Sequence, residues 1–171
     1  MRVVILGIGN LLLSDESVGV RALEALRDSH DVPPEVTLID GGTSGMELLE
    51  DLEGVDLLIV LDAVFANRTP GSFIRLSGDE VPVFFRRMLS PHQVGLSEVL
   101  ASLDLLGRAP REVVVLGVQP LTFETGMMLS APVAARAPSS SRCSPARFSA
   151  SMWSIGPSSA PKLCRSSSDH A

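Results

Sequence analysis

The chain has 171 residues, of which 45% are hydrophobic and only 4% aromatic, enough for one α/β domain with an aliphatic core. Through residue 136, ten arginines stand against nineteen acidic residues, and this net charge of −9 argues against nucleic acid as a partner. The longest apolar runs fall short of the roughly 18 residues of a membrane span, and the first residues lack a signal-peptide pattern. We therefore expect a cytoplasmic protein that does not enter a membrane.

The first half of the chain alternates predicted strands and helices. An apolar strand over residues 2–6 leads to an amphipathic helix over 17–29, and a second strand covers 36–40. A capping box that runs from Ser44 to Glu47 predicts a short helix, and a third strand follows over 56–62.

The second half continues the alternation. We expect an edge strand over residues 71–76, a helix over 95–107 that Gly107 ends, a strand over 112–118 and a last helix that begins near Ser130. This order predicts a three-layer α/β/α fold with a twisted, mostly parallel sheet of about five strands.

Residues 137–171 differ from the body in composition. They are rich in serine and proline, show no periodicity, and contain both cysteines, Cys143 and Cys164. We therefore expect one domain over residues 1–136 with neither a disulfide nor a thiolate metal site. Two interpretations of the tail stay open, a disordered segment and an out-of-frame translation that starts near residue 137.

The segment GIGNLLLSDESVG, residues 7–19, follows the first strand as a phosphate-binding loop would. It departs from the dinucleotide fingerprint because Leu12 occupies the position of the third glycine. Asp15 and Glu16 would also repel a phosphate. The loop is therefore expected to make a tight turn that carries acidic groups.

Three separated residues are candidates for a common site. Glu16 follows the first strand, Asp62 ends the third, and His92 precedes the helix predicted over 95–107. Because the carboxyl ends of parallel strands line the ligand crevice, the three side chains can converge there. Two carboxylates and an imidazole suit a divalent ion such as nickel or zinc.

Each candidate also has a structural explanation. Acidic residues in a first helical turn complement the helix dipole, Asp62 can cap a turn, and His92 can bond a carbonyl group. The segment DGGTSG, residues 40–45, ends the second strand at the same crevice, where its glycines permit close backbone approach or simply form a turn.

Five motifs occur in order: GIGNLLLSDESVGV, DGGTSG, LIVLDAV, SPHQVGLSEVL and GVQP. Together they resemble the hydrogenase maturation endopeptidases over about residues 1–135. The resemblance implies a peptidase of aspartyl type that removes the C-terminal extension of a [NiFe] hydrogenase large-subunit precursor after nickel insertion. The nickel would arrive with the precursor, and no permanently bound metal is expected.

The resemblance also assigns roles to residues. It implies that Glu16, Asp62 and His92 contact the metal and carry catalysis, and that the stretch of Asp40, Gly41, Gly42 and Thr43 recognises the substrate. Whether Glu16 or Asp62 acts as a general base stays open. The family usually has glycine where this chain has Ser17, and it ends in a helix whose second half the tail replaces here.

Two alternatives remain at this point. One is a nickel-binding maturation chaperone without protease activity. The other is an enzyme that resembles peptidyl-tRNA hydrolase, which shares the Gly-x-Gly-Asn start, although the acidic body weighs against it.

Overall fold

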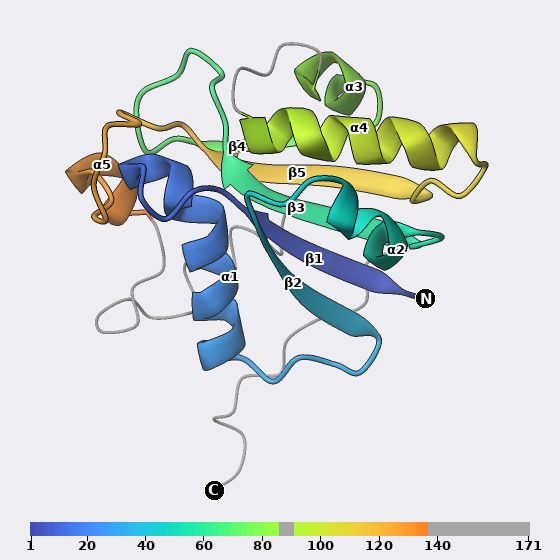
Figure 1. Ribbon diagram of the computed structural model, residues 1–171. Coiled ribbons are helices and arrows are strands. Elements are labelled where there is room, and N and C mark those ends of the chain that lie inside the picture. Colours follow the sequence, from blue (N-terminus) through green and yellow to red (C-terminus); the bar gives the residue numbers. More distant parts are fainter. Residues whose placement is uncertain (86–90, 137–171) are drawn as a thin grey trace, which may run out of the picture.

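A computed structural model describes residues 1–85 and 91–136 of the chain. Within them, one five-stranded sheet has the order β2-β1-β3-β5-β4 (Figure 1). The strands β1 (Val3–Ile8), β2 (Val36–Gly42), β3 (Leu57–Ala63) and β5 (Glu112–Val118) are parallel, and β4 (Phe73–Ser77) is the antiparallel edge strand. The predicted five-stranded, mostly parallel α/β fold is confirmed.

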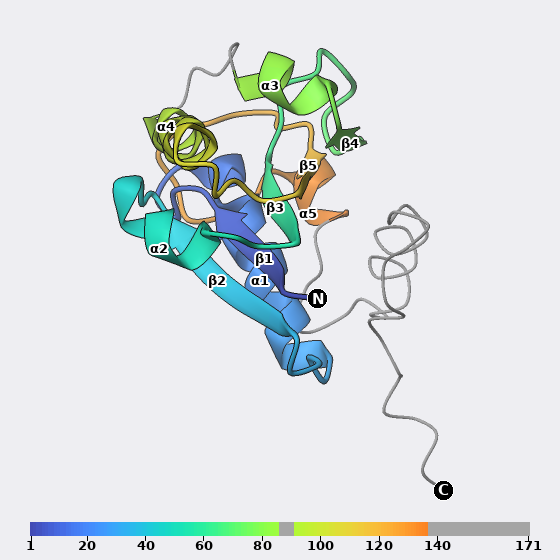
Figure 2. The same cartoon turned by 90° about the vertical axis from the view of Figure 1, so that its right-hand side faces the viewer.

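Helices cover both faces of the sheet, which gives the predicted three layers. One face carries α1 (Val18–Ser29), and the other carries α2 (Leu49–Leu52), α3 (Glu80–Phe85) and α4 (Pro91–Leu105) (Figures 1 and 2). Two short 3-10 turns, η1 (Ser14–Ser17) and η2 (Met46–Leu48), follow the ends of β1 and β2, and α5 (Ala131–Ala134) follows β5.

Strand alternation places two of the three apolar clusters of the described residues on opposite faces of the sheet. On the α4 face, Val4 and Leu6 of β1 pack with Leu96 of α4, and on the α1 face Val3 and Ile5 pack with other side chains that include Leu23. Both clusters contain side chains that are 0% exposed, and close packing of this kind makes the sheet a rigid base for the loops at its carboxyl edge.

Two expectations need correction, and one helix was not expected. Helix α4 begins at Pro91, so His92 lies in its first turn and does not precede it. The predicted capping box does not form, because Gly45 occupies the N-cap of η2 and Glu47 accepts the Gly45 N–H at 2.9 Å. Helix α3 was not predicted.

The expectations about the tail concern residues outside the described part of the chain. The structure does not describe residues 137–171, so both interpretations of the tail stand as predictions. No helix within residues 1–85 and 91–136 is both long and apolar enough to cross a bilayer.

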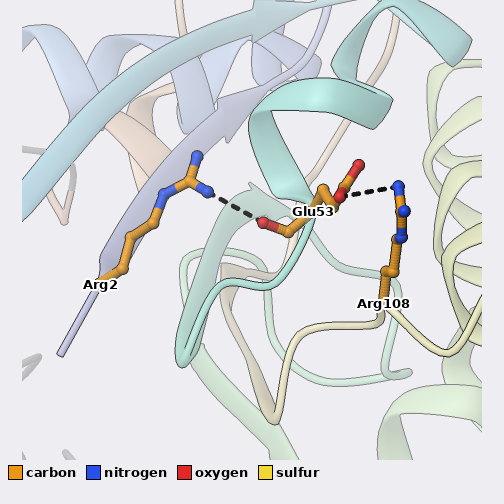
Figure 3. A network of polar contacts seen from close by, with 3 residues as sticks. All are labelled: Arg2, Glu53 and Arg108. Carbon is orange, nitrogen blue, oxygen red and sulfur yellow. Dashed lines mark hydrogen bonds and ion pairs between the residues drawn. The ribbon is translucent and has the colours of Figure 1, made fainter.

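Charged groups on the surface link the segments at the amino edge of the sheet, where the parallel strands begin. The Arg2 guanidinium donates to the Glu53 carbonyl at 2.9 Å, and Arg108 pairs with the Glu53 carboxylate at 2.9 Å (Figure 3). Asp56 accepts the Arg2 backbone N–H at 2.7 Å and pairs with Arg111 at 3.1 Å. This network ties the start of β1 to the loops before β3 and β5.

Candidate functional site

The loops that follow β1, β2, β3 and β5 meet at the carboxyl edge of the sheet. Gly7 of β1 aligns with Asp40 of β2 on one side and with Leu61 of β3 on the other. Turn η1 and helix α5 lie at this same edge (Figure 1). The topology therefore places Glu16, Asp62 and the segment 40–43 at one edge, as the sequence predicts.

Glycines bring the backbone around Glu16 into close contact with the sheet. A Cβ on Gly9, whose φ is +137°, would lie 1.8 Å from the Glu16 carbonyl oxygen. A Cβ on Gly19 would lie 2.1 Å from the Leu61 carbonyl oxygen. Gly19 thus gives the close helix-to-strand packing that the dinucleotide fingerprint assigns to its third glycine, where this chain has Leu12.

Asn10 stabilises the turn that leads to the acidic pair. Its side-chain oxygen accepts the Leu12 N–H at 2.9 Å, and its carbonyl accepts the Leu13 N–H at 3.1 Å. This arrangement is a local turn closed by the asparagine side chain. The loop after β1 is therefore shaped to present η1 at the sheet edge.

The two neighbouring acids have different environments. Asp15 is 0% exposed, and both of its carboxylate oxygens accept hydrogen bonds from residues 121–130. Its Oδ1 accepts the Ser130 N–H at 2.7 Å, and its Oδ2 accepts the N–H groups of Leu121 and Thr122 and the Ser130 hydroxyl. The interpretation that Asp15 only complements a helix dipole is therefore incomplete, because its carboxylate anchors a distant loop.

Glu16 and Asp62 are the other two buried acids at this edge, at 4% and 2% exposed. Asp62 lies in register with the β3 residues that face α4, since Leu58 and Val60 belong to the cluster on that face. Its Oδ1 accepts the Ala63 N–H at 2.7 Å. A buried carboxylate on the α4 side, close to the end of the strand, is well placed to face the first turn of that helix.

His92 comes from the first turn of α4, but its side chain lies outside the described part of the structure. Among the described side chains, no group of three or more His, Cys, Asp or Glu residues could hold a metal ion. The metal-contacting set of Glu16, Asp62 and His92 therefore stays a prediction. Asp62 and α4 share one face of the sheet, as that prediction requires.

The segment 40–45, which includes residues 40–43, contacts both the end of β1 and α4. The Gly42 carbonyl accepts the Gly9 N–H at 2.8 Å, and Asp40 Oδ1 accepts the Gly42 N–H at 3.0 Å. Just beyond, a Cβ on Gly95 of α4 would lie 3.0 Å from the Gly45 Cα. The segment thus bridges the β1 loop and the first turns of α4.

The exposed side chain of Asp40 is on the opposite face from Asp62. Val36 and Leu38 of the same strand pack on the α1 side, and by strand alternation Asp40 follows them. Asp40 and Thr43 are both exposed, whereas Gly41 is buried. This exposure fits contact with a large partner, although the role of these residues in substrate recognition stays a prediction.

Exposed apolar side chains lie on the segments that meet at this carboxyl edge. They come from loops after four strands and from the first turn of α4, and they comprise Leu11, Leu12, Met46, Phe65, Val94, Leu121, Met127 and Met128. The Gly126 N–H donates to the Leu12 carbonyl at 2.9 Å, so the two methionines lie beside the β1 loop. An apolar rim of this kind is typical of a surface that binds another polypeptide.

Two polar residues to which the sequence analysis assigned no role shape this edge. Gln119 Oε1 accepts the Ala66 N–H at 2.8 Å and the Arg68 N–H at 3.2 Å, which fixes the loop after β3. The buried Ser17 hydroxyl donates to the Ser14 carbonyl at 2.6 Å and accepts from Arg21 at 2.9 Å. The GVQP motif was the available signal for Gln119.

Comparisons with known proteins agree with this architecture. A sequence model described as hydrogenase maturation protease matches residues 20–142. The hydrogenase 2 maturation protease of Escherichia coli is 43% identical over 136 residues, which are 79% of this chain and 83% of that protein. The hydrogenase expression/formation protein HupD of Bradyrhizobium diazoefficiens is 46% identical over 134 residues, 77% of this chain and 70% of that protein.

Solved structures give the same result. The hydrogenase maturating endopeptidase HybD from Escherichia coli superposes with a TM-score of 0.76 at 43% identity and covers 79% of this chain and 84% of its own. The [NiFe] hydrogenase maturation protease HybD from Thermococcus kodakarensis has a TM-score of 0.65 at 27% identity and covers 80% of this chain and 91% of its own.

Proposed function

Since this chain belongs to the hydrogenase maturation protease family and is therefore a peptidase, we propose that it removes the C-terminal extension of a [NiFe] hydrogenase large-subunit precursor after nickel insertion. The structural observation that carries the proposal is the pair of buried carboxylates, Glu16 and Asp62, at an edge whose loops also carry exposed apolar side chains. The family membership leaves the alternative of an enzyme like peptidyl-tRNA hydrolase without support.

Nickel acts in this proposal as part of the substrate. The precursor brings the ion, and Glu16, Asp62 and His92 recognise it, so a precursor without nickel is not positioned for cleavage. Two carboxylate oxygens and an imidazole nitrogen are a suitable donor set for that ion. The ion can polarise the scissile carbonyl, and holding the peptide in place supplies part of the rate enhancement.

Protein residues provide the remaining chemistry. In an alternative to metal contact by both acids, Glu16 or Asp62 instead takes a proton from the attacking water. Asp40, Gly41, Gly42 and Thr43 contact the precursor beside the site, and the apolar rim excludes water around it. The burial of both carboxylates strengthens their interaction with a cation that enters the site.

The direct test is mass spectrometry of the precursor after incubation with the protein. We expect loss of a short C-terminal peptide from the nickel-loaded precursor and no change in the unloaded one. Glu16→Gln should abolish the cleavage, whereas Glu24→Gln, on the exposed side of α1, should leave it unchanged. A protein that binds nickel in the absence of the precursor, and that does not cleave the precursor when it is added, would instead be a nickel chaperone.

A further inference from the structure

The carboxylate of Asp15 holds a distant segment of the chain against turn η1. It accepts four hydrogen bonds, and all four donors belong to residues 121–130. Bonds from N–H and O–H groups to an ionised carboxylate are stronger than those between neutral groups. Within the described part of the chain, this anchor joins the loop after β5 to the turn after β1.

Further hydrogen bonds, made by the residues just before Asp15, connect the same two segments. The Ser14 N–H donates to the Gly126 carbonyl at 2.7 Å, and the Ser14 hydroxyl donates to the Glu124 carbonyl at 2.8 Å. Leu13 and Gly126 form an isolated parallel bridge. Residues 13–15 are thus fixed by the later segment immediately before the chain reaches Glu16.

Turn η1 needs this external support. Its N-cap, Leu13, makes no side-chain capping bond, and Ser14 adopts a φ of +44°, which is unfavourable for a residue with a Cβ. A short 3-10 turn with these features is not stable by itself. Its geometry therefore depends on the contacts with residues 121–130.

We propose that Asp15 is a positioning residue that fixes Glu16 for cleavage by clamping residues 121–130 onto η1. The inference rests on the role of Glu16 in the proposed function. A shift of about 1 Å in a reacting group can cost roughly 10²-fold in rate. Asp15 itself has both oxygens engaged by the protein, so it acts through its neighbour and not on the substrate.

The test is Asp15→Asn, assayed as cleavage of the nickel-loaded precursor over a range of precursor concentrations. Asparagine keeps the shape but replaces one accepting oxygen by an NH₂ group, which faces N–H donors it cannot bond. We expect kcat to fall by about tenfold or more while KM changes by less than about twofold. Amide hydrogen exchange at Leu121, Thr122 and Ser130 should also become faster.

A second variant covers the case in which Asp15→Asn does not fold. Ser130→Ala removes one donor and leaves the carboxylate and the Ser130 N–H in place. We expect a smaller fall in kcat in the same direction, again with KM retained. A rise in KM alone, in whichever of the two variants folds, would overturn the proposal.

Asp56→Asn is the matched control. Asp56 also accepts a backbone N–H, that of Arg2, but it lies at the opposite edge of the sheet. Its loss should lower the melting temperature without lowering kcat. If Asp15→Asn and Ser130→Ala, like the control, keep the kcat of the original chain, Asp15 is only structural and the proposal fails.

Glu16→Gln separates this failure from that of the proposed function. If Glu16→Gln cleaves as the original chain does, the role of Glu16 is wrong, and the positioning role of Asp15 falls with it. If Glu16→Gln is inactive while Asp15→Asn keeps its kcat, only the positioning role is wrong.

Discussion

At the amino edge of the sheet, Glu53 and Asp56 are partly exposed and pair with arginines, whereas at the carboxyl edge Asp15, Glu16 and Asp62 are almost fully buried. Exposed ion pairs contribute little to stability because water screens them and the side chains lose entropy. Buried carboxylates carry a large desolvation cost that strong partners must offset. The chain therefore uses acids in surface ion pairs at one edge and places a group of buried acids at the other, the edge to which we assign the proposed cleavage.

The first test of this comparison is Glu16→Gln, which should have the largest effect. Cleavage of the nickel-loaded precursor should fall by about 10²-fold or more, since the charge that we propose to contact the metal is lost. The far-ultraviolet circular dichroism should match that of the original chain, because glutamine has nearly the same shape. Cleavage within about twofold of normal would contradict the functional assignment of this edge.

A glycine substitution tests whether the carboxyl edge is also tightly packed. Gly9→Ala places a Cβ 1.8 Å from the Glu16 carbonyl oxygen, so the backbone must move. We expect urea denaturation to show a loss of more than about 2 kcal/mol in the free energy of unfolding.

The control lies at the amino edge. Gly54 also has a positive φ, +62°, but a Cβ there has no neighbour within 4 Å. Gly54→Ala should therefore cost only the conformational penalty of about 1 kcal/mol. Equal losses at Gly9 and Gly54 would show that the Glu16 carbonyl can move at little cost.

The sequence could predict part of the fold. The order of the strands along the chain and the presence of an edge strand followed from apolar runs and glycines, which are local signals. Helix α3 was missed because six residues with Pro82 at their centre show no helical periodicity. The start of α4 was placed four residues late, although Pro91 is a typical first residue of a helix.

The candidate site was predictable only in part. Glu16 and Asp62 were expected at one edge because parallel strands end there, and the structure places both acids at that edge. The partners of Asp15 could not be predicted, because Ser130 is 115 positions away and nothing in the local pattern links them. Ser44 failed as a cap since the chain reaches η2 through Gly45.

Removal of a surface ion pair at the amino edge should have a small effect. Arg108 and Glu53 expose 59% and 38% of their side chains, so Arg108→Ala should cost less than about 1 kcal/mol. Thermal denaturation at low and high salt should show that this small difference shrinks as salt is added. Cleavage should be unaffected, and a clear loss of activity would mean that the two edges are coupled.

The smallest effect concerns an exposed acid near the carboxyl edge. Hydrogen bonds from the backbone N–H groups of Glu47 and Gly45 lower the pKa of the Glu47 carboxyl below its ordinary 4.5. A lowered pKa in the folded state means that the contribution to stability is present above pH 4.5 and is lost as the pH falls through the lowered value.

Glu47→Gln should therefore lower the melting temperature slightly at pH 7, and the difference should close in acid. An NMR titration of the Glu47 carboxyl measures the pKa directly. A midpoint at or above 4.5 would contradict the assignment.

The bond between Asp15 and Ser130 also has a consequence for synthesis of the protein. Its 115-residue separation makes it one of the most non-local contacts in the described chain, and contacts of this kind form late in folding. A nascent chain still on the ribosome can pair β1 with β2 long before residue 130 emerges, yet the turn that carries Glu16 cannot be locked until then. If Asp15 positions Glu16 as proposed, a partly made chain lacks an ordered turn η1, and cleavage competence is acquired only when synthesis has passed Ser130.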